Sequence, residues 1–366
     1  MAMRRTVLII CGIVLVGFAS IVASAQEMEE SVPVGPPMPL IAPPLPPEGA
    51  MMPGFSGPAG PCPPPPSTGC QQAKAGLPPS VTVYGGYLDD NRGFSYTRDR
   101  ADGSGVPNLI FRMPVRGGWV GASSTVWLSE ALGITASAGL LIPVSNTPGE
   151  FRQEGVITGQ GALRSAQLSA DHQWGYVDGM GLFNVAAGEC GTFSIVGGFR
   201  WDHFESRQFI SLTDTTGETE TGTNNVTINA YIPYVGVQSF YQSSCSKVIA
   251  RLIGFPYVPG NVKFQESFNE TLATGAPVNG GGEYGSPFTF TSGYFAEFWI
   301  EAARKIIGDA YLGGFFRWNL IQAKTDFNPY TTTTDVGGAF TFDEKFKYYL
   351  HALTVGGLIS IDFNFF

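Results

Sequence analysis

The stretch Ile359-Ser360-Ile361-Asp362-Phe363-Asn364-Phe365-Phe366, which closes the printed sequence, decides the fold class. Its apolar residues alternate with Ser360, Asp362 and Asn364, and successive side chains of a β-strand point to opposite faces. A long strand with one apolar and one polar face suits a sheet that lies between lipid and water. Termini of soluble domains usually fray, so an aromatic strand at this position is an unusual feature for a soluble protein.

This stretch resembles the C-terminal strand of bacterial outer-membrane β-barrels, whose last residue is typically Phe. Phe366 departs from that pattern because it lies one residue out of phase with the apolar face. The resemblance implies a protein of the bacterial outer membrane, in contact with membrane lipid and with both termini in the periplasm. It also implies a terminal strand that the barrel assembly machinery recognises, carried here by Ile359, Ile361, Phe363, Phe365 and Phe366.

The N-terminal residues predict export. Arg4 and Arg5 precede an apolar run, and Ala23-Ser24-Ala25 follows it, which is the pattern of a signal peptide over residues 1–25. Residues 26–80 contain 17 of the 27 prolines and one aromatic residue, Phe55, so we expect a disordered, Pro-rich periplasmic linker. Contact between this linker and the cell wall is a further possibility.

Composition agrees with a sheet that has two different faces. Charged residues are 14% of the chain, aromatic residues are 13%, and there are 48 glycines. A net charge of −9 argues against nucleic-acid binding, which normally requires a basic patch.

Residues 81–366 predict an all-β, transmembrane, antiparallel up-and-down barrel of about ten strands. Four short turns alternate with five long polar connections, and nine connections join ten strands. The long connections fall near 91–115, 144–172, 207–225, 268–287 and 325–345. Short periplasmic turns and long outer loops are the pattern of bacterial barrels, and the surplus strand length should project as a rim. A secreted β-sandwich is the competing fold, but its strands are usually shorter.

Alternation along the strands predicts which side chains share a face. Phe288 and Phe290 are grouped with Tyr294 on the face opposite Glu297. Val226, Ile228, Ala230, Ile232 and Tyr234 share a face but Val235 and Val237 leave it, which predicts a β-bulge near Pro233. Tryptophan and tyrosine residues near strand ends are expected in the membrane-interface girdles. These are Trp119, Trp127, Trp174, Tyr348 and Tyr349.

The predicted polar face carries six charged residues, expected inside the barrel: Arg200, Asp202, Glu297, Glu301, Arg317 and Asp362. Unpaired charge is costly in a narrow barrel, so these groups should pair or stay hydrated. A ten-strand barrel is only slightly wider than one that its side chains fill. A salt-bridge plug is therefore favoured over a polar pore.

Cysteine and histidine give few further signals. Cys190 and Cys245 fall in two short turns on one rim, so a disulfide between them is possible. His172 follows Asp171 in a predicted loop, whereas Asp202 and His203 are strand neighbours that point to opposite faces and cannot pair. No catalytic constellation, metal site or cofactor motif is recognisable.

Three functions stay open from the sequence. The first is a non-enzymatic barrel with a structural, adhesive or binding role through its outer loops. The second is a small pore for ions or polar solutes. The third is a rim hydrolase acting on lipid or peptide, because some outer-membrane barrel enzymes, such as omptin proteases, place Asp/His pairs at the outer rim.

Overall fold

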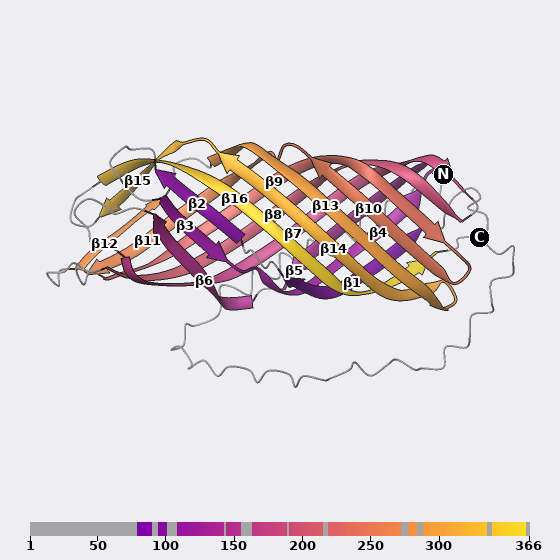
Figure 1. Ribbon diagram of the computed structural model, residues 1–366, viewed down its shortest axis with the longest axis horizontal. Helices are drawn as coiled ribbons and strands as arrows, with labels where there is room; N and C mark the ends of the chain where they lie inside the picture. The colour runs from indigo at the N-terminus through magenta and orange to yellow at the C-terminus, as the bar shows by residue number, and fades with distance from the viewer. Residues whose placement is uncertain are drawn as a thin grey trace, which may run out of the picture. The chain divides into compact units, whose positions relative to one another are not determined.

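The structure is a computed structural model that describes residues 79–89, 94–100, 108–142, 144–154, 163–188, 190–214, 219–271, 277–283, 288–334 and 339–363. These residues form one antiparallel β-barrel (Figure 1). The predicted signal peptide and nearly all of the predicted linker lie outside them. In the part of the chain so described, no helix is long and apolar enough to cross a membrane.

The barrel contains sixteen strands, and all of their pairings are antiparallel. The strands are β1 (Ser80–Asp89), β2 (Phe94–Arg100), β3 (Asn108–Met113), β4 (Arg116–Trp127), β5 (Leu132–Leu141), β6 (Val144–Glu154), β7 (Leu163–Ala187), β8 (Gly191–Asp214), β9 (Thr219–Gln242), β10 (Ser246–Phe255), β11 (Gly260–Thr271), β12 (Pro277–Glu283), β13 (Phe288–Ile307), β14 (Ala310–Thr325), β15 (Asn328–Thr334) and β16 (Ala339–Asp362).

The pairings make two stacked rings of ten strands each. The proximal ring, at the end where β1 begins and β16 ends, runs β1-β4-β5-β7-β8-β9-β10-β13-β14-β16 and closes through β1–β16. The distal ring runs β16-β2-β3-β6-β7-β8-β9-β11-β12-β15 and closes through β15–β16. Strands β7, β8, β9 and β16 are long enough to belong to both rings.

The distal ring corrects the prediction of five long loops. The expected loop residues are largely strands, and they include all of β2, β3, β6, β12 and β15. The β8–β9 pairing continues without a break from Gly191–Tyr241 to Thr213–Thr219. Each of the two rings nevertheless contains ten strands, which is the predicted number.

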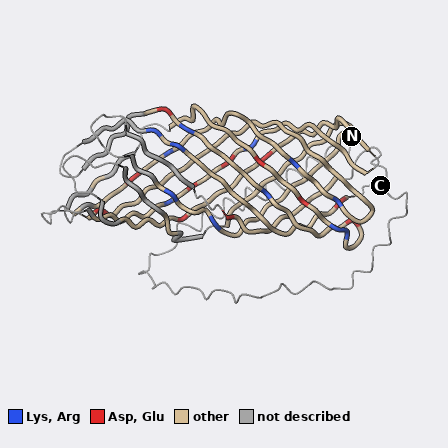
Figure 2. Tube along the Cα trace, viewed as in Figure 1, with Lys and Arg blue, Asp and Glu red and all other residues tan. Residues whose placement is uncertain are grey.

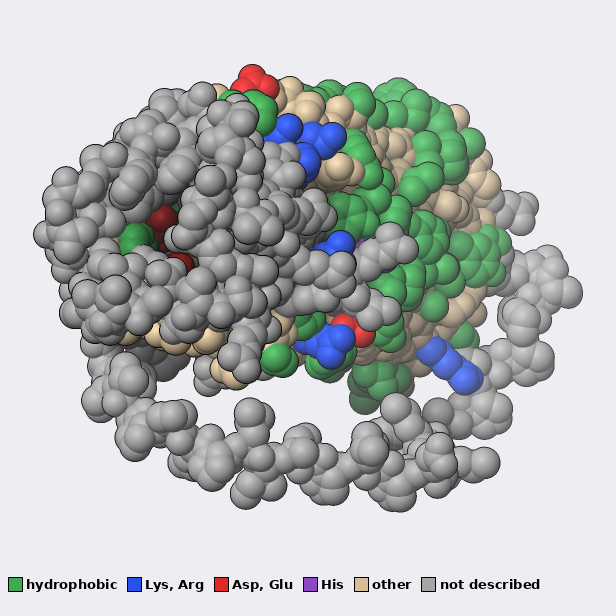
Figure 3. All heavy atoms as spheres, turned by 60° about the vertical axis from the view of Figure 1, so that its left-hand side comes forward, with side chains coloured by type: hydrophobic (Ala, Val, Ile, Leu, Met, Phe, Trp, Pro, Cys, Tyr) green, Lys and Arg blue, Asp and Glu red, His purple; other side chains and the backbone are tan. Residues whose placement is uncertain are grey.

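The outward face changes character partway along the barrel. Near the proximal end, outward side chains are apolar and exposed, for example Val83, Ile195, Val235, Leu312 and Ile359. Figure 3 shows this apolar belt as a green surface. The belt ends at outward residues such as Tyr87 on β1, Val177 on β7, Trp201 on β8 and Tyr231 on β9. Polar and charged residues follow on the distal side.

The inward face changes in the opposite sense. Proximal inward side chains are mostly polar, such as Thr82, Gln238 and Lys247, whereas distal inward side chains form a packed apolar core. On β9, Val226, Ile228, Ala230, Ile232 and Tyr234 all belong to that core. The proximal half is therefore built for lipid outside, and the distal half has the apolar interior of a protein surrounded by water.

This exchange explains one wrong prediction about faces, and a β-bulge explains another. No bulge occurs at Pro233, which pairs in continuous register with Phe199; Val235 and Val237 point outward simply because lipid replaces water there. A bulge does occur between Phe290 and Ser292, and it brings Phe288 and Phe290 onto the inward face with Glu297.

The prediction that five aromatic residues lie at the membrane interface is also partly wrong. Trp119, Trp174 and Tyr348 are buried inside the barrel, where they join the core.

Gly308 has a φ of 53° in the turn between β13 and β14, a conformation that glycine adopts without steric cost.

Candidate functional site

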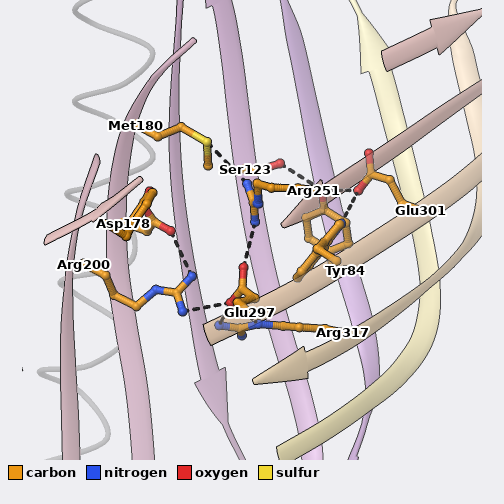
Figure 4. A network of polar contacts seen from close by, with 11 residues as sticks. Tyr84, Ser123, Asp178, Met180, Arg200, Arg251, Glu297, Glu301 and Arg317 are labelled. Carbon is orange, nitrogen blue, oxygen red and sulfur yellow. Dashed lines mark hydrogen bonds and ion pairs between the residues drawn. The ribbon is translucent and has the colours of Figure 1, made fainter. Parts of the chain in front are cut away.

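A cluster of buried ion pairs crosses the lumen at the level where the polar and apolar interiors meet (Figure 4). At its centre, Glu297 on β13 contacts three arginines. Glu297 Oε2 lies 2.8 Å from Arg200 Nη1 and 2.7 Å from Arg317 Nη2, and Glu297 Oε1 lies 3.2 Å from Arg251 Nη2. Arg200 Nη2 also donates to Asp178 Oδ2 at 3.0 Å, and these two residues are directly opposed on neighbouring strands. Figure 2 shows the acidic and basic positions along the barrel wall. The cluster therefore ties together five strands of the proximal ring.

Aromatic rings surround the cluster. The Arg317 guanidinium lies 4.3 Å from the ring centroid of Tyr176, and 5.9, 5.6 and 5.7 Å from those of Trp119, Trp174 and Trp299. Cations over aromatic faces are attracted by the ring quadrupole, and more strongly when water is excluded. Arginine charge is thus balanced by carboxylates and aromatic faces together.

On the distal side of the cluster the lumen is filled. Phe264 and Phe288 both contact Phe346, with ring centroids 5.5 and 4.8 Å apart, and Phe290 stacks on Tyr348 at 6.2 Å. All of these side chains are buried members of one apolar core. Interiors of this kind are close-packed, so these described side chains close the lumen on the distal side of the ion cluster.

On the proximal side lies a polar pocket. Hydroxyl groups line much of it, together with Gln238 and Gln242 and the charged residues Lys247, Arg251, Glu301 and Asp362. The hydroxyl-bearing residues are Ser80, Thr82, Tyr84, Ser123, Thr125, Thr135, Ser137 and Tyr176. This pocket is the hollow part of the lumen on the side of the barrel's termini.

The six charges predicted for the lumen are all buried inside, but they fall into four groups. Arg200, Glu297 and Arg317 share the central cluster. Glu301 instead accepts hydrogen bonds from Tyr84 Oη at 2.8 Å and Trp299 Nε1 at 3.1 Å. Asp362 pairs with Lys247 at 2.8 Å near the proximal end, and the Lys247 ammonium also donates to Ser360.

Asp202 forms the fourth group. Both of its carboxylate oxygens are buried without a hydrogen-bond partner from the protein, as are the indole nitrogens of Trp119 and Trp174. Buried polar atoms of this kind normally bind ordered water.

Sequence reasoning missed three charged members of this lumen. Asp178 lies between Val177 and Gly179 on β7, and Arg251 lies between Ala250 and Leu252 on β10. Lys247 also lies on β10. Each is a polar residue in phase with the inward face, so the same alternation that found Arg200 could have found them.

His172 and His203 lie on opposite sides of the barrel wall. His172 is on β7, not in a loop, and its buried ring packs against Phe204 at 5.7 Å. It lies distal to Val177, outside the membrane-spanning part, and its two nitrogens have no hydrogen-bond partner. Burial lowers the pKa of His172 to about 4, so this residue is a neutral core histidine at pH 7.

His203 faces outward, just distal to Trp201. It contacts Glu205 Oε1 at 3.0 Å and Asn229 Oδ1 at 2.9 Å, whereas its neighbour Asp202 points inward, as predicted. The hydrogen bond between His203 and Glu205 raises the pKa of His203 and lowers that of Glu205. This arrangement is an ion pair on the exterior wall, away from the lumen.

The predicted disulfide between Cys190 and Cys245 is wrong, because Cys245 carries a free thiol. The Cys190 carbonyl accepts from Gln242 on β9, whereas the Cys245 carbonyl accepts from Lys305 on β13, so each turn is bonded to a different strand. No group of three or more His, Cys, Asp or Glu residues in the described ranges could hold a metal ion.

Comparison with known proteins supports the fold. No family model and no curated protein matches the sequence. Among solved structures, the outer membrane protease OmpT from Escherichia coli is similar, with a TM-score of 0.54 and 10% identity over 78% of this chain and 97% of that chain. The translocator domain of the autotransporter NalP from Neisseria meningitidis gives a TM-score of 0.30, with 10% identity over 78% and 88% of the two chains.

The chain therefore has the fold of a transmembrane β-barrel of the outer-membrane class. The apolar belt and the closed ten-strand rings carry this assignment, and the similarity to OmpT agrees with it. At 10% identity, that similarity concerns the fold alone.

Proposed function

We propose that this chain is a non-enzymatic protein of the bacterial outer membrane that does not conduct solutes. Its working surface is the distal ring, which serves a structural, adhesive or binding role. Both termini of the barrel would then lie in the periplasm, with the terminal strand around Ile359 and Ile361 serving as the signal for barrel assembly. Residues 26–80 would connect the barrel to the periplasm or the cell wall.

The closed lumen is the observation that carries this proposal. Five proximal strands meet in the ion cluster, and the apolar core fills the space beyond it. A solute would have to displace both layers to pass. The distal ring, by contrast, extends strands beyond the apolar belt, where they face water and are open to partners.

Planar-bilayer conductance tests the closed lumen. Refolded protein with heat-modifiable gel mobility should produce no stepwise current at about 1 M salt, where charge screening is strong and an open porin reconstituted in the same way does conduct. Reproducible unitary steps would contradict the proposal.

The polar proximal pocket favours a pore as the second candidate, because it provides part of a hydrated path.

The hydrolase alternative has less support. Catalysis by histidine needs a carboxylate to orient it and a nucleophile or water within reach. His172 is sealed in the core, and the His203–Glu205 pair lies on the outer wall just beyond the apolar belt. Neither lines the proximal pocket.

Trimming the distal ring tests the surface role. Replacing the ends of β8 and β9 beyond Gln208 and Asn224 with a two-residue turn should leave the proximal ring assembled. Bacteria producing the trimmed chain should then be retained less than wild type on a mucin-coated surface, or should aggregate less with one another. Unchanged retention and aggregation, with equal amounts of folded barrel, would count against a surface role.

A further inference from the structure

We propose that the polar pocket at the proximal end of the lumen binds a small neutral polyol, such as a monosaccharide. Glu301 on β13, Gln238 on β9 and Ser137 on β5 line this pocket and would bind the hydroxyl groups of the ligand. This inference goes beyond the proposed function, because the pocket lies at the opposite end of the lumen from the distal ring. It concerns the pocket alone and holds whichever compartment the proximal end faces.

Glu301 carries a hydrogen-bond acceptor that the described residues leave unused. Its side chain is only 5% exposed, and its two hydrogen bonds, from Tyr84 Oη and Trp299 Nε1, both end on Oε2. No described residue donates to Oε1. Figure 4 shows one carboxylate oxygen of Glu301 facing Tyr84 and the other pointing away from it. Buried acceptors in proteins are normally paired, so an O–H or N–H group inside the pocket must supply this bond.

Two further polar side chains of the pocket are also available to a ligand. Gln238 is buried and Ser137 is partly buried, and neither side chain forms a hydrogen bond with another described residue. Their polar atoms are not sealed in the wall, unlike the carboxylate oxygens of Asp202, so they face the open space of the pocket. An amide and a hydroxyl each offer both a donor and an acceptor, which is what the hydroxyl groups of a polyol require.

The charges that line the pocket favour a neutral ligand. Two are positive, Lys247 and Arg251, and two are negative, Glu301 and Asp362. Lys247 pairs with Asp362 at 2.8 Å, and Arg251 pairs with Glu297 at 3.2 Å. Because the four charges sum to zero, an added ion would be repelled by one sign about as much as it is attracted by the other. Hydrogen bonding, rather than net charge, therefore selects the ligand.

Apolar side chains complete the wall of the pocket. Trp127, Phe240 and Ile249 line it and are only partly buried. Pockets for small molecules commonly combine apolar surface with a few placed polar groups. A polyol ring presents C–H groups on its faces and hydroxyl groups around its edge, so it can contact both parts of this wall. Water alone would satisfy the polar groups but would gain nothing from Trp127 and Phe240.

Isothermal titration calorimetry of the full-length mature chain tests this site. The protein is held in tetraethylene glycol monooctyl ether, a detergent without a sugar headgroup. D-Glucose is the probe, and tetrahydropyran, the same ring without hydroxyl groups, is the ligand control. Glucose should bind with a Kd on the order of a few millimolar, an ordinary affinity for a ligand of its size. Tetrahydropyran should bind at least about tenfold more weakly, because it makes none of the polar contacts.

Two substitutions in the pocket identify the groups that bind glucose. Glu301→Gln keeps the volume of the side chain but removes the carboxylate, and it should weaken binding at least about tenfold. Glu205→Gln is the matched control, because it makes the same change on the outer wall and should leave the affinity unchanged. Gln238→Leu should weaken binding about fivefold, and it serves as the test if Glu301→Gln fails to fold on a heat-modifiable gel.

No glucose binding up to about 50 mM, far above the expected Kd, would overturn the proposal and leave a pocket that holds only water. Equal affinity of wild type, Glu301→Gln and Gln238→Leu would also overturn it, as would equal binding of tetrahydropyran and glucose. Stepwise current in planar bilayers would instead refute the closed lumen, so the two failures can be told apart.

Discussion

Replacing Glu297 with Gln should lower the free energy of unfolding of the barrel by about 3–5 kcal/mol, the range for removing one partner of a buried ion pair. Glu297 is fully buried and contacts three arginines at 2.7, 2.8 and 3.2 Å. Glutamine has nearly the same volume, so packing is preserved and the loss is electrostatic. The three guanidiniums would then lose the one carboxylate that all of them contact.

Urea unfolding of the refolded barrel in detergent micelles, followed by tryptophan fluorescence, measures this change. The midpoint should fall by at least roughly 1 M, since slopes are about 1–3 kcal/mol per M. Glu205→Gln is the control: that carboxylate has one partner, His203, and its side chain is 37% exposed, so a loss below about 1 kcal/mol is expected.

A second substitution separates charge from packing. Adding Arg251→Gln to Glu297→Gln removes one positive charge as well, and the double variant should recover part of the lost stability. If Glu297→Gln alone costs less than about 0.5 kcal/mol, a loss typical of ordinary surface substitutions, the ion cluster does not hold the barrel together, and the account of a rigid plug is refuted.

Two further predictions concern acid sensitivity and strand contact. The pKa of His172 is about 4 in the barrel against about 6.5 unfolded, so stability should be complete above pH 6.5 and fall as pH drops toward 4. The free energy of unfolding should fall between pH 7.5 and pH 4.5 by about 2–3 kcal/mol more for wild type than for His172→Phe, and an equal fall in both would exclude this origin. A Cβ on Gly313 would clash with the Ala302 carbonyl oxygen, whereas one on Gly179 would meet nothing within 4 Å. Gly313→Ala should therefore reduce the folded fraction on heat-modifiable gels, Gly179→Ala should not, and equal yields would contradict the close approach of β13 and β14 at Gly313.

Alternation and turn spacing were enough to predict a ten-strand barrel. Short turns such as the one at Gly308 are easy to recognise, and each implies two antiparallel strands. The distal ring was missed because its segments read as polar connections, such as Thr331–Thr334 on β15 and Gly280–Gly282 on β12. Only pairing with a neighbouring strand makes such a segment a strand.

The lumen was predictable in part for a similar reason. Arg200, Glu297 and Arg317 could be placed inside because charge cannot lie on a lipid-facing surface without cost. Their convergence on one carboxylate depends on strand register and side-chain direction, which a single sequence does not specify. Near Pro233, the apolar residues change from the inward to the outward face. A β-bulge and a change from water to lipid outside the strand produce the same sequence pattern, and the bulge was inferred wrongly.

The exchange of apolar side chains between the two faces also sets the depth at which the barrel sits. Movement of the barrel by two residues toward its distal end would expose residues such as Tyr87 and Trp201 to water. Movement toward its proximal end would take Arg116 and Arg207 toward hydrocarbon, at a cost that grows from about 0–1 kcal/mol at the boundary to about 2–4 kcal/mol for each at the midplane. A bilayer of unsuitable thickness must therefore stretch or thin around this protein, because the wall of the cylinder has a single level at which it matches the hydrocarbon.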